Sequence, residues 1–118
     1  MTELTYWPRA EWSPIPRPGV KGVDGRLLHH AEGDELLAQL RFEAHATIDE
    51  HDALHPIDVY CLEGSGFTSV AGQAAPLRSG QRAHWPAGVL HRLWTDGDTM
   101  VTLMHEHLGQ GAATPPTS

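Results

Sequence analysis

Histidine is unusually frequent in this chain and is the side chain best suited to chemistry here. The 118 residues include nine histidines, and imidazole both titrates near neutral pH and commonly binds transition metals. His51 and His55 share strand parity, so in an extended segment both side chains point the same way. His91 follows Pro86 and Gly88, a pair typical of a tight turn. These three histidines are therefore candidates for metal or proton chemistry.

The stretch 80–95, GQRAHWPAGVLHRLWT, has to position His91. Polar and apolar residues alternate on both sides of the Pro-Gly turn, which predicts strand, turn, strand. The order G-x5-P-x-G-x2-H resembles the second motif of the cupin superfamily through His91, and Thr95 stands where the family usually has Asn. The resemblance implies a small β-barrel in which this histidine is commonly a metal ligand.

A second stretch resembles the other cupin motif, G-x5-H-x-H-x3-4-E-x6-G, only in part. Counting back from Gly64, four motif positions fall as follows: the glutamate on Ile57, the second histidine on Ala53, the first histidine on His51 and the leading glycine on His45. The surrounding VYCLEGSG resembles the family's strand and glycine turn. Two of the four ligands that the family uses are therefore missing, although the strand and glycine turn of the motif are kept.

His55 is the replacement ligand that we predict, because it shares the parity of His51. We expect His51, His55 and His91 to converge on a divalent transition metal, Fe(II), Zn, Ni, Cu or Mn. Some cupin dioxygenases use three histidines without a carboxylate. Asp58 has the opposite parity and is a weaker candidate. In the alternative interpretation, His51 and His91 are remnants of a metal site, hydrogen-bonded inside a pocket that binds an organic ligand without metal.

The remaining patterns predict an all-β chain, a small antiparallel β-barrel of the cupin, jelly-roll type. Apolar residues alternate along 35–42, which favours a strand over the helix that ELLAQL alone would allow. Gly64 and Gly66 predict a hairpin. Cys61 is expected to face the barrel interior, and Trp85 and Trp94 are interpreted as packing residues. Further strands are expected at 26–30, 57–62, 67–71 and 99–107, turns at 19–25 and a loop at 44–56.

The chain is expected to form one domain with three parts. Residues 1–19 carry Trp7, Trp12 and four prolines, a composition that predicts an extended arm. The barrel is expected at 20–108 and a disordered tail at 109–118. The arm packs either on a neighbouring subunit, as the resemblance implies, or on its own barrel. A homodimer is expected, because so small a core gains from association.

Charge and composition exclude several classes of partner. The chain has 8 Lys and Arg against 15 Asp and Glu and no basic run, which argues against nucleic acid. Its apolar runs are too short to span a bilayer, so no membrane partner is expected. The N-terminal residues lack a signal-peptide pattern, and the single Cys61 agrees with a reducing compartment. We therefore expect a cytoplasmic protein.

Two classes of function follow from the resemblance and the histidines. The first is a small metalloenzyme with dioxygenase- or isomerase-like chemistry on a small organic molecule. The second is a non-catalytic domain that binds or senses a small ligand. The other histidines are interpreted plainly: His84 lines a rim, and His105 and His107 lie at a strand end near solvent.

Overall fold

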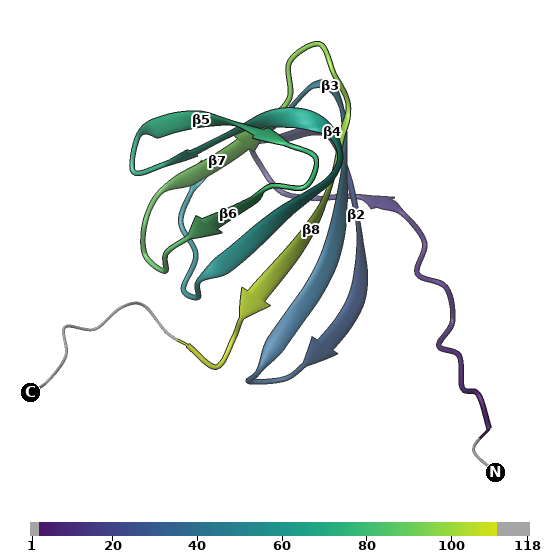
Figure 1. The fold of residues 1–118 in the computed structure, drawn as a ribbon. Coiled ribbons are helices and arrows are strands. Elements are labelled where there is room, and N and C mark those ends of the chain that lie inside the picture. Colours follow the sequence, from purple (N-terminus) through teal and green to yellow (C-terminus); the bar gives the residue numbers. More distant parts are fainter. Residues whose placement is uncertain (1–2, 111–118) are drawn as a thin grey trace, which may run out of the picture.

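The computed structural model describes residues 3–110 and is built from strands (Figure 1). No helix occurs among these residues, and every strand pairing is antiparallel. None of the described segments could therefore cross a membrane as a helix. The strands are β1 (Ser13–Pro14), β2 (Val20–Ala31), β3 (Glu35–His51), β4 (Ile57–Val70), β5 (Gln73–Arg78), β6 (Arg82–Trp85), β7 (His91–Trp94) and β8 (Met100–His107).

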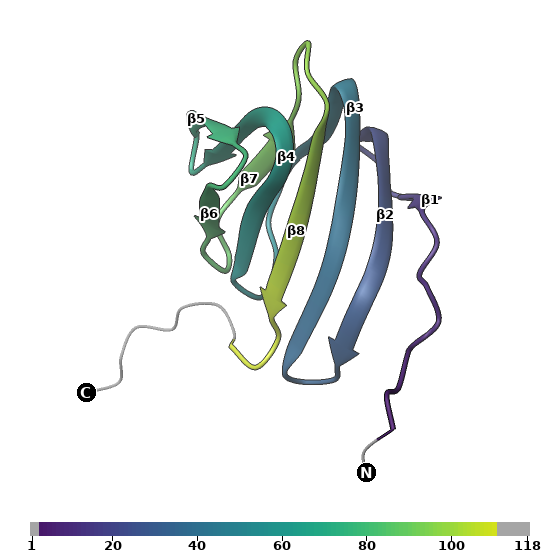
Figure 2. The same cartoon turned by 45° about the vertical axis from the view of Figure 1, so that its right-hand side comes forward.

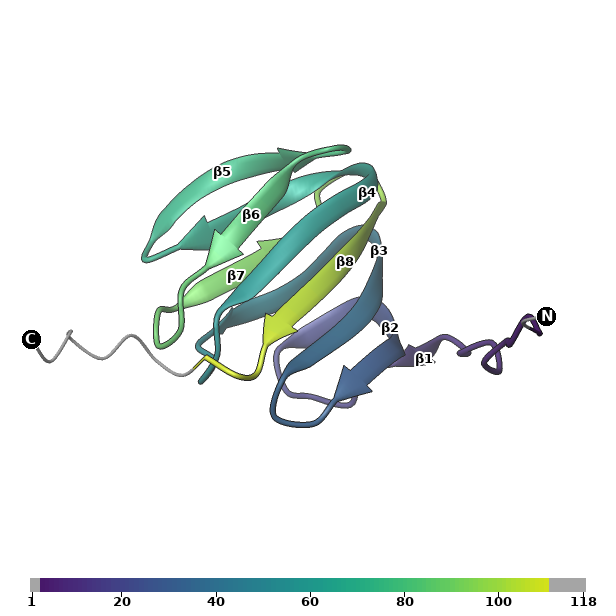
Figure 3. The same cartoon turned by 60° about the horizontal axis from the view of Figure 1, so that its bottom comes forward.

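Two long strands close the barrel. The first half of β3 pairs with β8 and its last residues pair with β7. In the same way, β4 pairs first with β8 and then with β7. The circle β3–β7–β4–β8 is therefore complete, with β2 beside β3 and with β5 and β6 beside β4 (Figures 2 and 3). The predicted all-β antiparallel barrel is confirmed.

The predicted hairpin at Gly64 and Gly66 is wrong, because β4 runs through both glycines as one curved strand. Gly64 has a φ of 73°, and a Cβ there would lie 1.9 Å from the carbonyl oxygen of Thr99. A Cβ on Gly66 would lie 2.5 Å from the carbonyl oxygen of Trp94. The glycines therefore permit a close approach between strands and do not reverse the chain.

The turns predicted at 19–25 and the loop predicted at 44–56 are also largely strand. β2 begins at Val20 and absorbs Gly22, with a φ of 71°, as an irregularity in its pairing with β3. β3 continues to His51 through His45, whose φ of 57° is the left-handed conformation that favours glycine. Because His45 occupies the leading glycine position of the first motif, this conformation supports the register given to that motif.

Thr95 stands at the motif position where the cupin superfamily usually has Asn. It links the end of β7 to this irregular part of β3 through hydrogen bonds. Its hydroxyl accepts a hydrogen bond from the amide of Ala46 at 2.9 Å and donates one to the carbonyl of Glu43. Thr95 is buried, so these bonds satisfy a polar group that would otherwise be costly inside the barrel. Its role is to hold the two strands that carry His51 and His91.

The core lies between the curved strands and is filled by their inward residues. Cys61 is 2% exposed, which confirms that it faces the interior. The core residues are Val23, Leu40, Phe42, Ala46, Ile48, Ile57, Val59, Cys61, Leu77, Trp85, Leu93 and Met100.

The N-terminal arm joins the barrel only near its end. β1 pairs with the free edge of β2, and Arg26 and Arg41 lie over the ring of Trp12 at 4.2 and 4.5 Å. Before that point the chain runs away from the barrel (Figure 1), and Tyr6 and Trp7 are each 81% exposed. Of the predicted tail, 111–118 lie outside the described residues.

Candidate functional site

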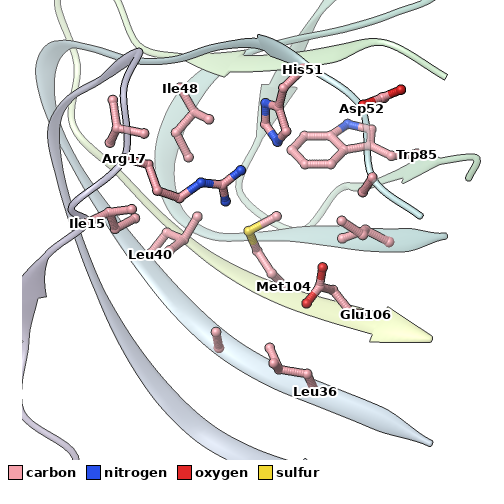
Figure 4. A pocket seen from close by; sticks show the side chains of 14 residues that line it. Ile15, Arg17, Leu36, Leu40, Ile48, His51, Asp52, Trp85, Met104 and Glu106 are labelled. Carbon is pink, nitrogen blue, oxygen red and sulfur yellow. The ribbon is translucent and has the colours of Figure 1, made fainter. Parts of the chain in front are cut away.

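A cavity of about 320 Å³ lies inside the barrel beside the last residue of β3. Most of its wall is apolar, formed by inward side chains of β3, β4 and β8 together with Trp85. Strand alternation places these side chains on the same face. The wall also holds four polar side chains, Arg17, His51, Asp52 and Glu106 (Figure 4).

The barrel brings His51, which lines this cavity, together with His91 behind it. The two residues are register partners in the β3–β7 pairing. Their Nε2 atoms lie 3.2 Å apart, and their rings meet edge to face with centroids 4.5 Å apart. His91 is buried, at 1% exposure. Two of the three predicted ligands are thus neighbours, although 40 residues separate them in the chain.

The hydrogen bonds of both imidazoles assign their tautomers. His51 Nδ1 lies 2.8 Å from the carbonyl oxygen of Asp49, and His91 Nδ1 lies 3.1 Å from that of Val89. A carbonyl oxygen only accepts, so each Nδ1 carries a hydrogen and donates it. In the neutral rings both Nε2 atoms then hold a lone pair, and the two lone pairs face each other. A cation or a proton between the rings relieves this repulsion.

Trp85 holds His91 in place from the other side. The two rings stack with centroids 4.0 Å apart and an angle of 11° between their planes. The indole Nε1 donates to the hydroxyl of Thr68 at 3.0 Å, and that hydroxyl donates to the carbonyl of Arg92 at 2.9 Å. Trp85 is therefore a packing residue, as predicted, and it also orients the histidine.

The surroundings of His91 favour its neutral form. Burial, followed by the neighbouring His51, lowers the pKa of His91 to about 4, and Arg17 adds to this effect. The hydrogen bond to Val89 and the charge of Asp52 oppose the shift. At neutral pH the imidazole is consequently uncharged, which is the state that can bind a metal.

His55 is not brought to this pair. Its Nδ1 lies 2.7 Å from the carbonyl oxygen of Gln110, and it does not line the cavity. The parity argument requires an extended chain, but β3 ends at His51 and β4 starts only at Ile57. Within residues 3–110, no three histidine, cysteine or carboxylate side chains are grouped so as to hold a metal ion.

Two apolar residues stand where the cupin motif has its other ligands. Ala53 and Ile57 both line the cavity. Sequence reasoning missed Glu106 and Arg17 as cavity residues. Glu106 could have been found, since it shares strand parity with the inward-facing Met104. Arg17 carries no such signal, because it lies outside the strands.

A second histidine cluster lies on the outer face of the barrel. Asp58 has the opposite parity to the buried Ile57, and its carboxylate accepts hydrogen bonds from His84 Nδ1 at 2.9 Å and His107 Nε2 at 2.7 Å. Burial raises the pKa of Asp58, but the hydrogen bonds from His107 and His84 outweigh this and leave it lowered. The ring of His105 lies 4.2 Å from that of His107. Asp58 is therefore not part of the cavity.

Comparisons with known proteins show solved structures of similar fold, but no matching family model and no matching curated protein. No family model matches the chain, and no curated protein matches it. The polyketide cyclase RemF from Streptomyces resistomycificus superposes with a TM-score of 0.78 at 17% identity, over 98% of this chain and 89% of that one.

Two further solved structures show the same likeness. A cupin-2 domain from Rhodospirillum rubrum has a TM-score of 0.77 at 15% identity, over 100% of this chain and 82% of that one. A predicted oxalate decarboxylase from Thermotoga maritima has a TM-score of 0.71 at 20% identity, over 83% of this chain and 90% of that one. The closed antiparallel barrel, the glycine positions of both motifs and these likenesses agree: the chain has the fold of the small single-domain cupins.

Proposed function

We propose that this protein binds a divalent transition metal through Nε2 of His51 and of His91, next to a cavity that takes a small organic molecule. The observation that carries the proposal is the pair of Nε2 atoms facing each other at 3.2 Å while both Nδ1 atoms are engaged by carbonyl oxygens. Two imidazole nitrogens on one tetrahedral zinc would lie about 3.3 Å apart. Carbonyl acceptors on the second ring nitrogen are also what orients histidine ligands in metal sites.

When bound, such a metal supplies Lewis-acid or oxygen-activating chemistry. The residues of the chain would do the rest. The apolar wall excludes water from the ligand, and the carboxylates of Asp52 and Glu106 face the cavity as groups able to hold or move a proton. Because only two side chains bind, water and the organic ligand would complete the coordination. The reaction class that we propose is dioxygenase- or isomerase-like.

A metal-free function is the second candidate, and Ala53 and Ile57 favour it. These residues replace two of the usual ligands with apolar side chains at the cavity wall. In that case one proton would lie between His51 and His91, since 3.2 Å also suits an N–H···N hydrogen bond. The protein would then bind an organic ligand without chemistry on it.

Metal content of the untagged protein distinguishes the two candidates. After equilibration with Fe(II), Zn or Ni and removal of free ions, we expect one ion per chain in the wild type. We expect the same in His55→Ala, because His55 contacts Gln110 and not the pair. A wild type that retains no ion contradicts the metal proposal. Loss of the ion in His55→Ala alone would restore the three-histidine set.

A further inference from the structure

Among residues 3–110, Arg17 is the one residue with a permanent positive charge in the wall of the cavity. Figure 4 shows its guanidinium reaching toward the middle of the cavity from the side of Ile15 and Leu40. The carboxylates of Asp52 and Glu106 lie on the other side. Among residues 3–110, no carboxylate oxygen lies within 4.0 Å of this guanidinium. The arginine therefore faces the cavity without an ion-pair partner from the described chain.

The backbone of Arg17 is held rigidly. Pro16 precedes it and Pro18 follows it, and prolines restrict both their own φ and the residue before them. Pro18 and Gly19, with a φ of 79°, form a turn closed by the bond from the amide of Val20 to the carbonyl of Arg17.

Two contacts anchor this turn to the barrel. The amide of Asp49 donates to the carbonyl of Gly19 at 2.8 Å, and Ser13 and Pro14 pair with β2. A side chain on so constrained a segment has little backbone freedom to lose when a ligand binds.

The cavity combines this cation with an apolar interior. Leu40, Ile48 and Met104 surround the space in front of the guanidinium. A planar guanidinium binds a carboxylate through two parallel hydrogen bonds. His51 lines the same cavity as Arg17. A ligand that spans the cavity therefore meets the cation and His51 together.

We propose that Arg17 selects the ligand of this cavity, a small and mainly apolar organic carboxylate whose carboxylate group pairs with the guanidinium. The inference deepens the proposed function and depends on its cavity, but it does not depend on the metal. It also assigns the segment around Arg17, outside the closed barrel, to the binding site.

Benzoate and its neutral amide, benzamide, test this selection, because they match in shape and differ in charge. Affinities for both are measured by titration calorimetry on the wild type, Arg17→Gln, Arg17→Lys and Arg9→Gln. Arg9 is a matched control, an exposed arginine of the same arm outside the cavity. We expect benzoate to bind about tenfold more tightly than benzamide in the wild type and in Arg9→Gln, as for one charge-assisted interaction near a surface. The ratio should fall to about one in Arg17→Gln and be partly kept in Arg17→Lys.

The proposal is overturned if Arg17→Gln keeps the wild-type preference, if Arg9→Gln loses it equally, or if the wild type binds neither probe or both alike. Metal content measured on the same samples separates this result from the proposed function. A wild type that holds metal but ignores the charge of the probe overturns only the role of Arg17. A wild type that discriminates through Arg17 without holding metal supports that role and contradicts the metal site.

Discussion

Two groups of histidines in this protein differ in what faces their imidazole nitrogens. On the outer face, His84 and His107 each donate to the carboxylate of Asp58. At the cavity, His51 and His91 donate to backbone carbonyls and turn their remaining nitrogens toward each other. The outer histidines have a negatively charged partner, whereas within residues 3–110 no carboxylate lies within hydrogen-bond distance of the inner pair.

This difference separates a structural cluster from a binding site. A carboxylate between two imidazoles accepts a hydrogen bond from each of them. A buried and a half-buried imidazole with opposed lone pairs are satisfied only when something positive lies between them. Both clusters contain nearby histidines, so the hydrogen-bond partners, and not the number of histidines, indicate where a ligand binds.

The largest expected effect is on zinc affinity after one substitution in each cluster. His91→Gln should weaken zinc binding at least about 100-fold, because it removes one of the two ligands that we propose. His84→Gln should leave the affinity unchanged, since its partner is Asp58. Zinc titration followed by calorimetry measures both. Equal losses in the two variants would break the comparison.

The second largest effect is expected on the free energy of unfolding when the packing around the inner pair is changed. Trp85→Ala removes a side chain that is 1% exposed and stacks on His91, so we expect a loss of about 3–5 kcal/mol in the free energy of unfolding. Asp58→Asn should cost about 1–2 kcal/mol, because the outer cluster is partly exposed. Urea unfolding monitored by circular dichroism tests the order, and a larger loss in Asp58→Asn would reverse it.

His91 of the inner pair and Asp58 of the outer cluster should affect the free energy of unfolding in separate pH ranges. The pKa of His91 is lowered from 6.5 to about 4. Between these pH values the unfolded metal-free chain therefore binds a proton that the folded chain does not bind. Unfolding free energy should therefore fall between pH 6.5 and 4, by up to about 3 kcal/mol. The lowered pKa of Asp58 acts in the same direction, but only as the pH falls through and below 3.8.

Urea titrations at a series of pH values check this assignment. His91→Gln should lose the slope between pH 6.5 and 4 and keep the slope at lower pH. An unchanged slope in that variant would show that other groups cause the acid sensitivity.

The smallest effect on either cluster is expected from removing residues 1–12. This deletion leaves β1 and Arg17 in place and removes Tyr6 and Trp7, whose exposure agrees with the homodimer that we predict. Sedimentation should show a dimer that the deletion weakens, with unchanged zinc affinity. A wild type that is monomeric at micromolar concentration contradicts the dimer.

The sequence predicted the fold and both histidines of the inner pair through short-range signals. His91 follows a Pro-Gly turn, and the motif register that pairs it with His51 is supported by the left-handed His45. His55 does not lie beside this pair, because parity applies only while a strand continues, and the chain turns between β3 and β4.

Other features depend on contacts that no local pattern encodes. Glycines mark hairpins and close approaches alike, so Gly64 could not reveal that β4 continues. Arg17 reaches the cavity only because β1 pairs with β2 and the following turn contacts β3. Such tertiary placement is beyond reasoning from residue spacing.

The most direct test of the account is the tautomer of the inner pair. Nitrogen-15 NMR of the imidazole rings, recorded at neutral pH on the metal-free protein and again with zinc, distinguishes protonated from lone-pair nitrogens. We predict that both rings carry a hydrogen on Nδ1, that Nε2 of His91 holds a lone pair, and that zinc shifts the Nε2 signals of His51 and His91. A hydrogen on Nε2 of His91 in the metal-free protein, with no response of either ring to zinc, would contradict the account.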